Sequence, residues 1–122
     1  MPVAANVLAV PVIGRYSRKR SLYLTEALTF GVTKHQARAV ILDLTGLREI
    51  DEDTAATIQR LVAMIKLLGA HTVLTGVSAA VAQTLVRLEI DLVAQDVLIR
   101  PTMRAGIALA LQLVKRRRDR DR

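Results

Sequence analysis

Residues 39–46 read AVILDLTG, the most strand-like stretch of the chain. Its apolar residues follow one another almost without interruption, a pattern typical of a strand that is covered on both faces. Thr45 and Gly46 then supply a turn that ends the run. The stretch therefore predicts an inner strand of a sheet, with other elements packed above and below it.

The segment that follows has the spacing of an amphipathic helix and is succeeded by a second strand and a second helix. Apolar residues recur at i, i+3, i+4, i+7 and i+10, namely Ile58, Leu61, Val62, Ile65 and Leu68. Gly69 comes next, in the position that ends many helices. Thr72–Thr75, closed by Gly76, predicts the strand. Ser78 is the expected N-cap of the next helix, which would bury Val81, Leu85 and Leu88.

Both ends of the chain continue this alternation. Val7–Ile13 predicts a strand, and Ser21–Lys34 predicts a helix with Leu24, Ala27 and Leu28 at helical spacing. Val97–Ile99 predicts a last short strand, and Pro101 and Thr102 open a helix expected to bury Ile107, Leu111 and Val114. The pattern predicts a single α/β domain over residues 1–114, with about four or five strands and about four helices.

Composition limits what the chain can be. It has 122 residues and no cysteine, so disulfides and thiolate chemistry are excluded. No apolar run approaches the roughly 20 residues that span a bilayer, and we expect a cytoplasmic protein without a membrane partner. The net charge is +7, and basic residues crowd into Lys115–Arg122. We expect these eight residues to be a disordered, solvated tail; binding of an anion is the alternative.

The sequence contains no recognisable catalytic or cofactor site. His35 and His71 are its two histidines, and they lie too far apart to form a metal-binding motif. No Ser or Thr lies in a nucleophile turn, and the glycines are isolated rather than gathered in a phosphate-binding loop. We therefore expect a protein that is not an enzyme and binds no metal or cofactor.

The start of the helix after residue 50 is acidic. Asp51, Glu52 and Asp53 precede Thr54 there, and their carboxylates complement the free N–H groups and positive dipole of a helix N-terminus. We expect Asp51 to be the N-cap and Thr54 to occupy the third helical position. Capping alone would explain these residues, and a partner-binding role is the alternative.

Several segments together resemble a known family. They are Val40–Leu47, Ile50-Asp51, Lys66–Ala70, Val73–Val77 and Val81–Val86, and they are similar to the STAS domains of anti-sigma factor antagonists, in particular those of the stressosome branch. The resemblance implies a mixed sheet of four to five strands with helices packed mainly on one face. It also implies partner switching, in which a kinase phosphorylates a Ser or Thr after the Asp that starts the second helix.

This sequence departs from the family pattern at that position. The residue after Asp51 is Glu52, whose permanent negative charge makes it a possible phosphomimic, natural or engineered. An alignment shifted by two residues would make Thr54 the acceptor, but it would also rotate the apolar face of the helix by about 200°. Thr84 and Thr75 are further hydroxyls that a kinase could modify, although structural roles are favoured for both.

The resemblance implies a non-catalytic signalling protein. It would bind a switch serine/threonine kinase and other STAS proteins as a homo- or hetero-oligomer, with Asp51 and Asp53 in the partner-binding helix start. A free-standing antagonist that binds one anti-sigma factor is the alternative within signalling. From another class, a nucleic-acid-binding module would act through the basic residues at the C-terminus.

Overall fold

The computed structural model describes residues 1–14 and 17–121. In chain order its elements are β1 (Pro2–Ala4), β2 (Val7–Pro11), α1 (Arg18–Lys34), β3 (Ala39–Asp43), α2 (Glu52–Leu67), β4 (His71–Thr75), α3 (Ala79–Arg87), β5 (Leu98–Arg100) and α4 (Met103–Arg120). Every strand and helix expected from the sequence is present, with ends shifted by a few residues. One strand, β1, was not predicted.

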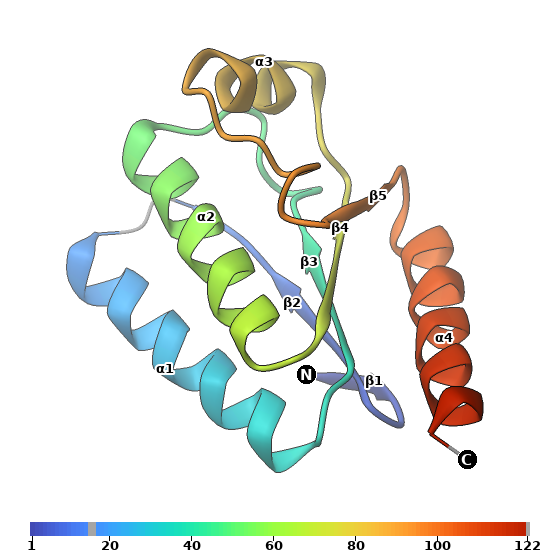
Figure 1. The fold of residues 1–122 in the computed structure, drawn as a ribbon. Coiled ribbons are helices and arrows are strands. Elements are labelled where there is room, and N and C mark those ends of the chain that lie inside the picture. The colour runs from blue at the N-terminus through green and yellow to red at the C-terminus, as the bar shows by residue number, and fades with distance from the viewer. Residues whose placement is uncertain (15–16, 122) are drawn as a thin grey trace.

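The strands form one mixed sheet in the order β1-β2-β3-β4-β5 (Figure 1). β1 is antiparallel to β2, and the remaining neighbours are parallel. The register aligns Ala39 of β3 with Val7 on one side and His71 on the other. As predicted, β3 lies in the middle of the sheet and is buried from Ala39 to Leu42.

Helices cover both faces of the sheet unequally. One face of the sheet, with Leu8, Val40, Leu42 and Leu74, forms the larger apolar core with α1, α2 and α3. The other face, with Val7, Ala9, Ile41 and Val73, packs against a single helix of the described residues, α4, through Ala110 and Val114. Figure 1 shows α1 and α2 side by side, with α4 apart from them. The α/β fold with helices mainly on one face is confirmed.

The buried face of α4 differs in part from the expected one. Leu111 is 46% exposed, and the buried positions are Gly106, Ala110 and Val114. The cause is close packing at Gly106, where an added Cβ would overlap the side chain of Thr75. The helix approaches the sheet through its small residues, which leaves the bulkier Leu111 exposed. Val114 is buried as predicted, and Ile107 is half-buried against the same core.

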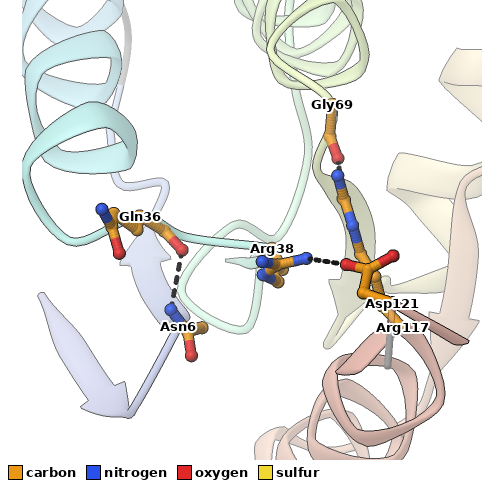
Figure 2. Close-up of polar contacts among 6 residues, drawn as sticks. All are labelled: Asn6, Gln36, Arg38, Gly69, Arg117 and Asp121. Atoms are coloured by element: carbon orange, nitrogen blue, oxygen red, sulfur yellow. Dashed lines mark hydrogen bonds and ion pairs between the residues drawn. The ribbon is translucent and has the colours of Figure 1, made fainter. Parts of the chain in front are cut away.

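The basic C-terminal residues are helical instead of disordered. α4 continues through Lys115 to Arg120, and its end is held by two contacts (Figure 2). Arg117 donates to the carbonyl of Gly69 just after α2, and Asp121 pairs with Arg38 at 3.2 Å. The expectation of disorder was therefore wrong for residues 115–120. The residues that hold this segment, Gly69 and Arg38, are distant in the sequence and leave no local signal. Arg122 lies outside the described residues.

No helix within residues 1–14 and 17–121 combines the length and apolar character needed to cross a membrane.

Candidate protein-binding site

The start of α2 lies at the carboxyl end of β3 and is fixed by its own N-cap. Asp51 adopts an extended backbone, and its Oδ1 accepts a hydrogen bond from the Thr54 backbone N–H at 2.8 Å. The buried side chains of Leu47 and Ile50 anchor the preceding loop. The predicted N-cap is confirmed, and the loop geometry leaves Asp51, Glu52 and Asp53 exposed together at the surface.

Contacts with α1 hold the first turns of α2 in place. The Thr57 hydroxyl donates to the carbonyl of Asp53 at 2.9 Å and lies 3.0 Å from the hydroxyl of Ser21 on α1. Both Ser21 and Thr57 are buried. Because α1 is bonded to α2 at this point, the acidic residues are presented by a braced helix rather than by a loose loop.

A shallow hollow of about 350 Å³ adjoins the helix start. Gly14 and Gly46 line it from the ends of β2 and β3, and Arg48, Asp51 and Thr54 line it from the loop and α2. The loop is also fastened to the start of α3, because the Ser78 hydroxyl donates to the carbonyl of Arg48 at 3.1 Å. The acidic residues and the hollow adjoin one another and form one surface, which we call the α2-start surface.

The hydroxyls considered as phosphate acceptors differ in exposure. Thr54 is only 1% exposed, and Thr75 is fully buried. Thr84 lies half-buried on α3, with its hydroxyl donating to the carbonyl of Ala80 at 3.1 Å. Glu52, by contrast, is an exposed residue at the first position of α2. Of these four positions, Glu52 is the most exposed, Thr84 is partly accessible, and Thr54 and Thr75 are buried.

Sequence reasoning missed a polar cluster at the carboxyl ends of β3 and β4. The Asp43 carboxylate at the end of β3 accepts hydrogen bonds from the hydroxyls of Thr45 and Thr75, both at 2.8 Å. Gly76 has a positive φ of 70°, and a Cβ there would overlap Thr45. The repeated Thr-Gly after β3 and β4 was the available signal, since two parallel strands end side by side.

Replacing Thr75 by Val is expected to lower the free energy of unfolding by about 1.5–3 kcal/mol, the usual contribution of a hydrogen bond to a charged group. The change keeps the size of the side chain but leaves Asp43 without one of its two hydroxyl donors. Urea denaturation measures the effect. Thr84→Val is the matched control and should cost less than about 0.5 kcal/mol, because this half-buried hydroxyl bonds only within its own helix. Equal losses in the two variants would contradict a structural role for the cluster.

The architecture defines a small α/β domain with a mixed five-stranded sheet and a capped, acidic helix start at its carboxyl edge. The chain belongs to the STAS domain family, whose model matches residues 1–105. It is 33% identical over 117 residues to RsbT co-antagonist protein RsbRA of Bacillus subtilis, which is 96% of this chain and 42% of that protein. It is also 29% identical over 92 residues to a blue-light photoreceptor of Listeria monocytogenes, covering 75% of this chain and 36% of that protein.

Solved structures agree with this assignment. A serine-to-glutamate variant of Moorella thermoacetica RsbS superposes with a TM-score of 0.74 at 22% identity, over 88% of this chain and 89% of that one. A chain from the molecular architecture of the stressosome gives 0.78 at 20% identity, over 93% and 96%. These matches confirm the predicted STAS fold and its similarity to the stressosome branch. The chain spans less than half the length of the curated relatives it matches.

Proposed function

We propose that this chain is a stressosome-type STAS scaffold or antagonist, a cytoplasmic protein that acts by binding other proteins and has no catalytic activity. Its partners would be a switch serine/threonine kinase or an anti-sigma factor, together with other STAS chains. The RsbT co-antagonist relatives and the fold shared with a stressosome chain support this assignment. The observation that carries it is the exposed acidic start of α2, in which Glu52 follows the capping Asp51.

Glu52 gives this surface a permanent negative charge. At the first position of α2 its carboxylate lies near the free N–H groups and the positive end of the helix dipole, where an added phosphate would also be stabilised. A carboxylate has one charge and two oxygens, whereas a phosphate carries nearly two charges and three acceptor oxygens. The chain would therefore behave as partly, not fully, phosphorylated. Asp51 and Asp53 extend the same negative surface toward a partner.

Self-association is the second element of the proposed function, and α1 offers a surface for it. Tyr23 and Phe30 are 75% and 67% exposed, and the exposed Leu22 lies on the same helix. Large apolar side chains gathered on one exposed helix are typical of a surface that another protein covers. We define these three residues as the α1 patch.

Light scattering of the purified chain at high concentration is expected to give a mass several times that of one chain. Tyr23→Ser combined with Phe30→Ser should reduce that mass, because it removes both aromatic side chains of the α1 patch. Val86→Ser combined with Val93→Ser is the matched control, since both valines are as exposed but lie outside α1. A strictly monomeric mass for the unaltered chain would contradict the scaffold and favour the free-standing antagonist that binds one anti-sigma factor.

A further inference from the structure

The end of the molecule remote from the α2-start surface contains two adjoining hollows. One, of about 430 Å³, is lined by the last turns of α4 and by His71 at the start of β4. The other, of about 550 Å³, lies between the residues around Val93–Leu98 and the same edge of β4. Gly69, His71 and Leu113 line both hollows. Each volume falls in the range of about 300–1,000 Å³ that is common for small-molecule sites.

The first hollow is strongly basic. Arg116, Arg117 and Arg120 line it, and Asp121 is the carboxylate on its wall, so positive groups outnumber negative ones by three to one. Arg116 and Arg120 are four residues apart and project from the same side of α4. We call this feature the α4 basic hollow.

Two of the four charged side chains that line the α4 basic hollow already bond to other parts of the fold. Asp121 is paired with Arg38, and Arg117 donates to the carbonyl of Gly69, as Figure 2 shows. Among residues 1–14 and 17–121, no carboxylate forms an ion pair with Arg116 or Arg120. Arg117 and Asp121 thus hold the end of α4. The guanidinium groups of Arg116 and Arg120 remain to line the hollow.

We propose that the α4 basic hollow binds a small multivalent phosphate. Guanidinium groups match phosphate oxygens in charge and in bidentate geometry. Because Arg117 and Asp121 already fix the helix end, the backbone that carries Arg116 and Arg120 is held in place before a ligand arrives, which lowers the entropic cost of binding. The ligand would bind apart from the α2-start surface, so this site is independent of the proposed partner switch.

Nucleic acid is the less favoured ligand for these charges. Apart from His71, none of the residues that line either hollow has an aromatic ring, so a nucleic-acid strand would lack the row of rings on which successive bases stack. The guanidinium groups also surround a concave site instead of following an extended stripe along the surface. These features favour a compact phosphate over a nucleic-acid strand.

Isothermal titration with inorganic triphosphate tests the site. Arg116→Ala combined with Arg120→Ala should weaken binding at least about tenfold, by analogy with other charge-assisted contacts. The unaltered chain should also bind less tightly as salt is raised, because salt screens exposed charges. Arg117 is left in place, so the contact with Gly69 is kept.

Arg87→Ala combined with Arg104→Ala is the matched control, because it removes the same charge from exposed positions elsewhere. This variant should bind triphosphate as the unaltered chain does. If both double variants bound triphosphate equally weakly, the proposal would be overturned, because triphosphate would then be attracted by the overall charge of the protein and not by this hollow. Absence of triphosphate binding, or binding of duplex DNA through Arg116 and Arg120 without any binding of triphosphate, would overturn it as well.

Discussion

Leu61→Ala is expected to lower the free energy of unfolding by about 2–5 kcal/mol. Leu61 is fully buried at the centre of the apolar stripe of α2 and belongs to the larger core that α1, α2 and α3 form with the sheet. Truncation removes apolar contacts and leaves a cavity that the surrounding close-packed side chains fill only in part. Urea denaturation, followed by circular dichroism, measures the loss.

Leu67→Ala is the matched control, because it is the same chemical change on the same helix. Leu67 is 87% exposed, so its truncation should alter stability by less than about 0.5 kcal/mol. If Leu61→Ala cost no more than Leu67→Ala, the rotation of α2 about its own axis would be wrong.

That rotation also determines which residue α2 presents to a partner. Residues in a helix are separated by about 100°, so Glu52, nine positions before Leu61, lies on the opposite side of α2. Thr54 lies seven positions before Leu61 and therefore shares its buried side. The exposed Glu52 and the nearly inaccessible Thr54 follow from the same helical phase that buries Leu61.

The elements that sequence predicted well have local signals. The apolar run of β3 and the stripe of α2 are visible within a few residues, and Ser78 and Asp51 are followed at once by the helices that they cap. The side-chain oxygen of each cap accepts from a backbone N–H three residues ahead, so no distant residue is needed to recognise it.

The features that sequence did not predict depend on contacts between distant residues. β1 has only three residues, and its turn relies on Asn6, which has a positive φ of 66° and donates to the carbonyl of Gln36 at 2.9 Å. The exposure of Leu111 on α4 depends on the close approach of Gly106 to the sheet, and the order of residues 115–120 depends on Gly69 and Arg38. None of these partners can be read from the local pattern.

Only part of the candidate site could be predicted from the sequence, for the same reason. The acidic start of α2 could be found because charge at a helix N-terminus is a local signal. The cluster of Asp43, Thr45 and Thr75 could not, since it joins two strands whose neighbouring positions are set by the sheet. The hollow beside Asp51 likewise requires the ends of β2 and β3 to meet the loop before α2.

Glu52→Ser is expected to give the chain a phosphate acceptor at position 52, so that its charge there can be switched by phosphorylation instead of being fixed. A serine there would be exposed at the first position of a braced, capped helix, where the proposed switch kinase would reach its hydroxyl and the helix dipole would stabilise the added phosphate. The unaltered chain offers a carboxylate at this position and should not accept phosphate there. The expected change is from no modification to a large modified fraction.

Glu49→Ser is the matched control. Glu49 is an exposed glutamate three residues before Glu52; it lines the hollow but lies in the loop before Asp51 and outside the helix. A serine at position 49 would lack the N–H groups of a first helical turn and should remain essentially unmodified. Equal phosphorylation at positions 49 and 52 would show that the kinase attacks any exposed hydroxyl near the hollow.

The most direct measurement is the location of phosphate after incubation with ATP and the cognate switch kinase, recovered from the host by pull-down with this chain. Peptide mass spectrometry of the unaltered chain, Glu52→Ser and Glu49→Ser identifies the modified residue in each. The proposed function predicts phosphate at position 52 of Glu52→Ser and none on the unaltered chain. Phosphate on Thr54 of the unaltered chain would contradict it, because the acceptor would then be a buried residue and Glu52 would not stand in for a phosphorylated one.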